Sequence, residues 1–90
     1  MTSKKPSAFL LIIDPNFLED LRYWTKTNPK TASKVLDLLE AIRREPFEGL
    51  GKPEPLKGFD TWSRRISQEH RLLYRVEGQR VHCLQCRYHY

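Results

Sequence analysis

A stretch rich in proline and glycine, residues 46–58 (PFEGLGKPEPLKG), divides this 90-residue chain into two halves with different hydrophobic periodicity. The stretch holds three of the six prolines and three of the four glycines, which predicts a loop with a stiffened backbone. Before it, apolar residues recur with a helical period, whereas after it they follow the alternation of β-strands. A chain of this length buries one lean core, so we expect both halves to form a single domain.

Two consecutive helices are predicted between residues 14 and 44. Asp14 followed by Pro15 is a typical N-terminal helix signal, and Asn28 followed by Pro29 repeats it. Pro46 is expected to end the second helix. The predicted apolar stripes consist of Phe17, Leu21 and Trp24 in the first helix, and of Ala32, Val35, Leu36, Leu39 and Ile42 in the second.

Strands are predicted on both sides of this helical hairpin. The short apolar run 8–13 stops at Asp14 and has the length of a buried strand rather than of a secretion signal. WSRRIS, HRLLYRV and RVHCLQCRYHY are rich in β-branched and aromatic residues, and breaks at 68–69 and 77–79 separate them. The expected fold is therefore α+β. It has an N-terminal strand, a two-helix hairpin and an antiparallel three-stranded meander, with the helices on one face of a single sheet. We expect residues 8–90 to form the domain and residues 1–7 to be a disordered basic tail.

Strand alternation predicts a polar face on this sheet, opposite the helices. Ser63, Arg65, Arg71, Arg87 and His89 fall on that face if the apolar residues of each strand point toward the helices. Two residues break the pattern, because Leu73 falls on the polar side and Arg64 on the apolar side.

The two cysteines, Cys83 and Cys86, form a single CxxC. On a regular strand they point to opposite faces with Cα atoms about 10 Å apart, which is beyond the reach of a disulfide. We therefore expect buried structural thiols in a reducing cytoplasm, and no metal site.

The formal charge of +5 is concentrated in the second half of the chain, because residues 49–90 contain eight Lys and Arg but only four Asp and Glu. Scattered basic residues on a solvated surface would account for this excess. A shared basic face would instead indicate a polyanionic partner, either nucleic acid or an acidic protein.

The polar face carries groups that suit RNA cleavage without a metal or cofactor. Glu54, between two prolines, could accept the proton of a ribose 2′-hydroxyl, arginines could stabilise the phosphorane, and His89 could protonate the departing 5′-oxygen. Each residue also has a plain explanation, as a solvated arginine, a loop glutamate or an incidental terminal histidine. His70 and His82 are expected to be structural.

GKPEPLK, WSRRI, EHRL and the closing CRYHY together resemble the YoeB/Txe branch of the RelE/ParE toxin superfamily, and the resemblance runs from Ala8 to Tyr90. It implies a bacterial type II toxin of the same fold that cleaves messenger RNA in the ribosomal A site and is silenced by a cognate antitoxin. A cytoplasmic protein with no membrane association is expected, and the outer helix surfaces, including Tyr23 and Trp24, could serve a homodimer or the antitoxin.

The same resemblance implies roles for individual residues. The general base falls on Glu54, the phosphate-binding arginines on Arg65 and Arg71, and the general acid on His89, with Tyr90 stacking on a base or positioning the phosphate. Basic residues expected to contact RNA are Lys52, Lys57, Arg64 and Arg87. The loop 58–61 looks shorter than is usual in this branch, which bears on cleavage preference.

Two alternatives to a ribonuclease remain open from the residues. One is a relative that inhibits another target without cutting RNA, as the gyrase-poisoning members do, although these lack the Glu, Arg and His set. The other is a purely binding module, in which basic residues dock RNA or an acidic partner and His89 is inert.

Overall fold

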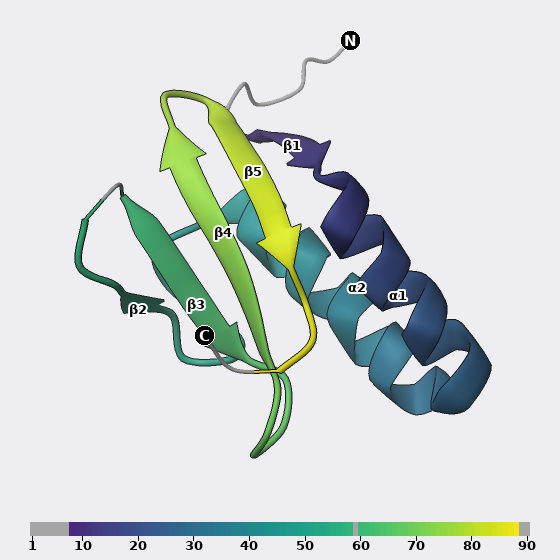
Figure 1. Cartoon of the computed structure of the whole chain (residues 1–90). Coiled ribbons are helices and arrows are strands. Elements are labelled where there is room, and N and C mark those ends of the chain that lie inside the picture. The colour runs from purple at the N-terminus through teal and green to yellow at the C-terminus, as the bar shows by residue number, and fades with distance from the viewer. Residues whose placement is uncertain (1–7, 59, 89–90) are drawn as a thin grey trace, which may run out of the picture.

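The computed structural model describes residues 8–58 and 60–88 and contains two helices and a five-stranded sheet (Figure 1). The elements are β1 (Leu10–Ile13), α1 (Pro15–Thr27), α2 (Pro29–Arg44), β2 (Glu54–Pro55), β3 (Thr61–Arg65), β4 (Arg71–Glu77) and β5 (Arg80–Gln85). This confirms the predicted α+β class, with an addition, because the KPEP segment forms the short edge strand β2. The predicted tail at 1–7 lies outside the described residues.

The helices begin where the sequence predicts. The Asp14 carboxylate accepts a hydrogen bond from the Asn16 N–H at 2.8 Å, and the Asn28 side chain accepts one from the Thr31 N–H at 3.3 Å. The Thr31 N–H also donates to the Asn28 carbonyl at 2.9 Å, so the two oxygens of Asn28 share this donor. The cap residues satisfy backbone donors of the first turn, and the proline that follows each cap lacks such a donor. Neither described helix is long and apolar enough to cross a membrane.

The sheet has the strand order β1-β5-β4-β3-β2. The predicted meander β3-β4-β5 is antiparallel, whereas β1 pairs parallel with β5, with Ile13 opposite Cys83. The chain returns from β1 to this sheet through the helical hairpin, and both helices lie on the same face (Figure 1). In the part of the chain that the structure describes, no helix covers the opposite face of the β3–β5 meander (Figure 1).

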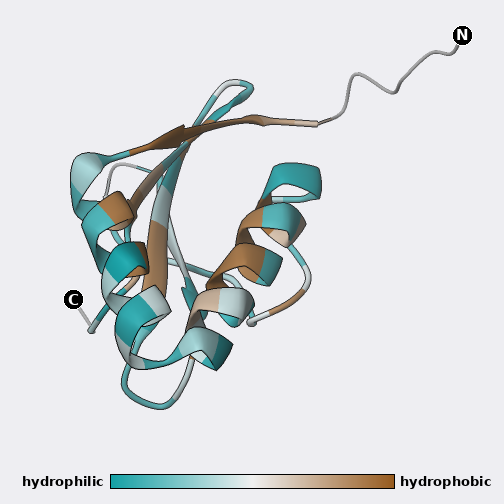
Figure 2. Cartoon of the chain, turned by 90° about the vertical axis from the view of Figure 1, so that its right-hand side faces the viewer, coloured by the Kyte–Doolittle hydropathy of each residue, from teal (hydrophilic) through white to brown (hydrophobic). Residues whose placement is uncertain are grey.

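The core lies between the helices and the sheet, and Figure 2 shows the hydrophobic residues of both helices on the sides that face each other and the sheet. The prediction that Leu36 belongs to the apolar stripe of α2 is wrong, because Leu36 is 54% exposed. Leu38 is fully buried in its place. Trp24 lies in the core, which confirms its place in the predicted α1 stripe and contradicts its expected place on an outer surface. It is 6% exposed, so only Tyr23 of that pair is available to a partner.

A β-bulge changes the direction of the two cysteines. Leu73 pairs with Gln85 and Tyr74 pairs with Cys83, so Leu84 is an extra residue on β5. Alternation is lost there, and Cys83 and Cys86 both enter the core. The prediction that they point to opposite faces is therefore wrong, whereas the prediction of buried free thiols is confirmed.

Arg64 is the most unusual core residue, because it is charged and fully buried. Its guanidinium donates hydrogen bonds to the carbonyls of Glu45 (2.6 Å), Glu48 (3.0 Å) and Leu50 (3.0 Å) and to the Tyr74 hydroxyl (3.0 Å). The Tyr74 hydroxyl in turn donates to the Pro46 carbonyl at 2.6 Å. One side chain of β3 therefore holds the loop that follows α2.

Replacing Arg64 with alanine should lower the free energy of unfolding by about 3–5 kcal/mol, because breaking a buried charged network leaves its other members without partners. Tyr74→Phe should cost about 1–3 kcal/mol through the same network. Urea denaturation of each variant measures both effects. The control is Arg65→Ala at the exposed neighbouring position, which should change stability by less than about 0.5 kcal/mol. Equal stabilities for the two alanine variants would contradict the anchoring role of Arg64.

Candidate functional site

Strand register places a carboxylate, a hydroxyl and two guanidinium groups on the uncovered face of the sheet. Glu54 on β2 is opposite Ser63 on β3, and Arg65 on β3 is opposite Arg71 on β4. Directly opposed residues share a face, and Ser63 and Arg65 are two positions apart on one strand, so all four belong to the same face. Arg64, between them, points to the core. The sequence-based prediction of a shared polar face is confirmed for Ser63, Arg65 and Arg71.

Arg71 is held at the centre of this group. Its Nη1 lies 3.4 Å from the Glu54 carboxylate and donates a hydrogen bond to the Ser63 hydroxyl at 2.9 Å. The Arg71 side chain is 11% exposed, whereas that of Glu54 is 58% exposed. The guanidinium is therefore fixed by neighbours, and the carboxylate remains accessible to a ligand.

Arg71 has further donors that no described residue uses. Both contacts use Nη1, and within residues 8–58 and 60–88 neither Nη2 nor Nε makes a hydrogen bond. A guanidinium presents five N–H donors in a planar fork, so the unused edge suits a phosphate. Arg65 is exposed and lies opposite Arg71, which places a second positive charge beside the same position. These four side chains (Glu54, Ser63, Arg65 and Arg71) are called the Glu–Arg cluster below.

The loop that leads into β2 is fixed by close backbone contacts. Gly51 has φ +86°, and its carbonyl accepts the Arg65 N–H at 2.8 Å. A Cβ at this position would lie 2.8 Å from Leu38 Cδ2 and 3.1 Å from Arg64 Cβ, so a side chain does not fit there. Lys52 and Lys57, on either side of β2, are exposed and are available to a polyanion.

Arg64 and Arg87 do not lie where their predicted contacts with RNA require. The buried hydrogen bonds of Arg64 leave it no surface for a nucleic acid. Arg87 stacks on the Tyr23 ring of α1, 3.5 Å from its centroid, and donates to the Tyr88 hydroxyl at 2.7 Å. The bulge on β5 turns Arg87 toward α1, so it does not lie with Arg65 and Arg71.

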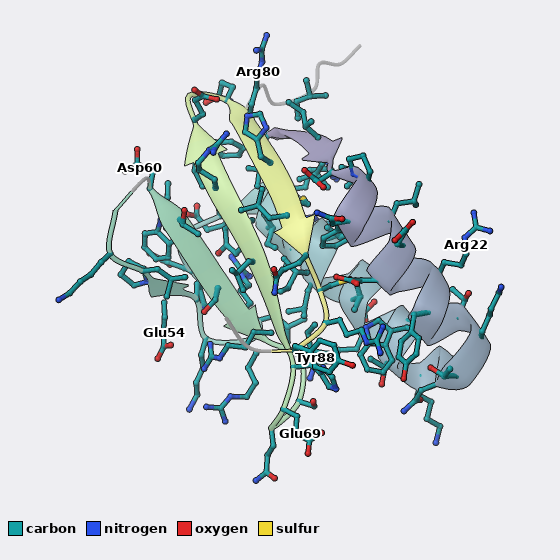
Figure 3. All side chains as sticks on the ribbon, in the orientation of Figure 1. Arg22, Glu54, Asp60, Glu69, Arg80 and Tyr88 are labelled. Carbon is teal, nitrogen blue, oxygen red and sulfur yellow. The ribbon has the colours of Figure 1, made fainter. Side chains whose placement is uncertain are left out.

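The last two predicted catalytic residues, His89 and Tyr90, lie outside the described residues. The described chain ends at Tyr88, whose carbonyl accepts the Arg71 N–H at 3.2 Å. Figure 3 shows Glu54 and Tyr88 toward one end of the sheet, whereas Asp60 and Arg80 lie at the other end. Tyr88, the last described residue, therefore lies beside the Glu–Arg cluster.

Sequence reasoning did not find every contact at this site. The hydrogen bond from Arg71 to Ser63 follows from the register of β3 and β4, which the sequence does not fix. The sequence predicts a structural role for His70 but not its contact with Tyr88, because these residues lie 18 positions apart in the chain. His82, for which the sequence predicts a structural role, forms a pair with Glu77 at 3.0 Å on the rim of the sheet.

Most of the chain matches a known protein family. Residues 13–90 match the model of the YoeB-like toxin of bacterial type II toxin-antitoxin systems. The chain belongs to this family. Toxin YoeB of Mycobacterium bovis is 48% identical over 79 residues, covering 86% of this chain and 93% of that protein. Toxin YoeB of Escherichia coli K12 is 49% identical over 76 residues, covering 80% and 88%.

Solved structures of YoeB toxins share the fold of this family member. A YoeB/ParE toxin from Agrobacterium tumefaciens superposes with a TM-score of 0.83 at 45% identity, over 90% of this chain and 99% of that one. The YoeB dimer from Staphylococcus aureus gives 0.81 at 37% identity, over 92% and 99%. The YoeB-YefM complex from the same organism gives 0.78 at 39% identity, over 91% and 98%.

The CxxC is part of the core rather than of the site. Burial raises the pKa of both thiols to about 12, with the Asp20 charge contributing at Cys86. No group of three or more potential metal ligands occurs among the residues that the structure describes. The thiols are therefore protonated at neutral pH, which disfavours both redox reactivity and metal binding.

Both cysteines should resist alkylation by iodoacetamide at pH 8 in the folded protein and react rapidly in denaturant. Because the folded pKa values of about 12 exceed the ordinary value of 9.0, the thiols stabilise the fold below about pH 9. That contribution is lost as the pH rises from about 9 to about 12. Mass spectrometry of the alkylated protein counts the modified thiols. Rapid modification of the folded chain would contradict their burial.

Proposed function

We propose that this YoeB-like toxin is an endoribonuclease that cleaves messenger RNA in the ribosomal A site through attack of a ribose 2′-hydroxyl on the adjacent phosphate. The observation that carries the proposal is the Glu–Arg cluster, in which a solvent-accessible carboxylate lies 3.4 Å from a largely buried guanidinium. A base and a phosphate-binding group are thereby close enough to act on one phosphodiester.

The proposed reaction follows from the roles of these groups. The Glu54 carboxylate takes the proton of the 2′-hydroxyl, and the 2′-oxygen forms a bond to phosphorus. Arg71 and Arg65 stabilise the added negative charge of the five-coordinate phosphorane, as oriented donors do. The bond to the 5′-oxygen breaks, and His89, adjacent to Tyr88 in sequence, supplies the proton of the new 5′-hydroxyl. The other product is a 2′,3′-cyclic phosphate.

The arginines favour this chemistry for a further reason. A guanidinium remains protonated at every physiological pH, so the positive charge at the phosphate does not depend on metal binding. The pair between Arg71 and Glu54 keeps the carboxylate beside the phosphate site before the substrate arrives. Metal-independent cleavage is therefore part of the proposal.

Presentation of the message by the ribosome is the proposed source of specificity. The Glu–Arg cluster lies on an open sheet face, and such a face cannot by itself orient a flexible strand. Holding the reacting groups in line accounts for much of the rate of such reactions. Lys52, Lys57 and the terminal Tyr90 are proposed to contact the RNA.

An antitoxin and a second copy are the proposed protein partners. Related toxins from Staphylococcus aureus form a complex with YefM and a dimer. We propose equivalent partners for this chain, and the exposed residues Leu18 and Tyr23 on α1 are candidates for contact.

Replacing Glu54 with glutamine should lower cleavage of message on translating ribosomes by about 10² to 10⁴-fold, because the variant cannot accept the 2′-hydroxyl proton. Mapping of message ends after single turnover measures the rate. The matched control is Glu48→Gln, an exposed glutamate of the same loop, which should cleave at the parental rate. Equal cleavage by the parent and Glu54→Gln would remove the carboxylate from the mechanism.

A message with a single 2′-deoxy substitution at the scissile nucleotide should resist cleavage, because the nucleophile is missing. Cutting of that message at the normal position would exclude attack by the 2′-hydroxyl. The alternative, a binding module that does not cut, predicts ribosome association without new message ends for either substrate.

A further inference from the structure

Cys86, the first residue after β5, is held by side chains from another element. The Cys86 N–H donates a hydrogen bond to the Asp20 carboxylate at 3.0 Å, and the Cys86 carbonyl accepts one from the Trp24 indole N–H at 2.8 Å. Both of these side chains belong to α1. The path of the chain beyond the sheet is therefore fixed by the helix that packs against β5.

Tyr88 is fixed on both sides of its Cα atom. Its N–H donates to His70 Nδ1 at 2.7 Å, and its carbonyl accepts the Arg71 N–H at 3.2 Å. Its φ of +66° lies in the left-handed region, which a residue other than glycine adopts only at an energetic cost. The surrounding contacts thus hold the Tyr88 backbone in this conformation.

His70 is well placed to hold this backbone. Its side chain is 16% exposed and packs edge-on against Trp24, with a centroid distance of 4.7 Å. Nδ1 accepts the Tyr88 N–H, so the ring is neutral and carries its proton on Nε2. The Nε2 atom lies 4.0 Å from the Glu69 carboxylate, which favours this tautomer.

We propose that His70 is a positioning residue, which fixes the backbone of Tyr88, the residue that precedes the proposed general acid His89 in the sequence. The role rests on the proposed ribonuclease function and deepens it. His70 does not touch the reacting atoms. Its neighbour Arg71 joins the two ends of the site, because its side chain contacts Glu54 and its N–H holds Tyr88.

Two substitutions separate hydrogen bonding from bulk. The Asn side chain places an acceptor near the position of Nδ1, whereas the longer Gln side chain places one near Nε2. We expect His70→Gln to cleave ribosome-bound message roughly 10- to 100-fold more slowly than the parent, with unchanged KM, and His70→Asn to recover most of that loss. The control His82→Gln, on the rim of the sheet, should match the parent.

A second substrate shows whether the defect lies in proton donation. In a message whose scissile 5′-oxygen is replaced by sulfur, the leaving group is a thiolate, which departs without a proton because thiols are far more acidic than alcohols. His70→Gln should cleave this message at nearly the parental rate. Equal losses on the oxygen and sulfur linkages would overturn the positioning of an acid and indicate a general structural defect.

Nuclear magnetic resonance tests the contact without relying on activity. Imidazole ¹⁵N shifts of the parent should show a neutral His70 protonated on Nε2, and the Tyr88 amide should exchange faster in His70→Gln than in His70→Asn. Unchanged exchange at Tyr88 in His70→Gln, with cleavage by the parent intact, would overturn this role alone. Absence of cleavage by the parent would overturn the proposed function, and this role with it.

Discussion

The guanidinium of Arg64 joins the loop that follows α2 to strands β3 and β4 of the sheet. From β3 it reaches the carbonyls of Glu45, Glu48 and Leu50 and the hydroxyl of Tyr74 on β4. Burial raises the pKa of Tyr74, so its hydroxyl stays protonated and donates to Pro46. A charged group with no exposed surface is costly to bury unless its donors are satisfied, and here several neutral oxygens satisfy them.

This network determines where the carboxylate of the site lies. With residues 45–50 held, the chain reaches Gly51, whose carbonyl accepts the Arg65 N–H, and then the two-residue strand β2. So short a strand provides little pairing of its own, and its position depends on the loop before it. Glu54 thereby comes within 3.4 Å of Arg71. Adjacent arginines thus have opposite roles, since Arg64 anchors the loop inside the core and Arg65 carries charge on the open face.

The sequence was sufficient to predict what local chemistry determines. The caps at Asp14 and Asn28, the turn at 78–79 within the predicted break at 77–79, and the alternation of Ser63 with Arg65 each follow from neighbouring residues. Strand alternation marks Arg64 as an exception on the apolar side, but no local pattern reveals the loop carbonyls that satisfy its donors. The sequence also does not reveal the β-bulge at Leu84, which turns Cys86 into the core and Arg87 toward Tyr23. Features that depend on long-range register and packing were the ones missed.

Hydrogen exchange at two backbone amides tests most directly whether the buried guanidinium positions β2. The Arg65 N–H is bonded to the Gly51 carbonyl at 2.8 Å and the Leu56 N–H to the Thr61 carbonyl at 2.7 Å. In Arg64→Lys, which keeps the charge but loses the planar fork, both amides should exchange at least ~10-fold faster, while amides of the β4–β5 hairpin stay protected. Unchanged protection at Arg65 and Leu56, or an equal loss across the whole sheet, would contradict the account.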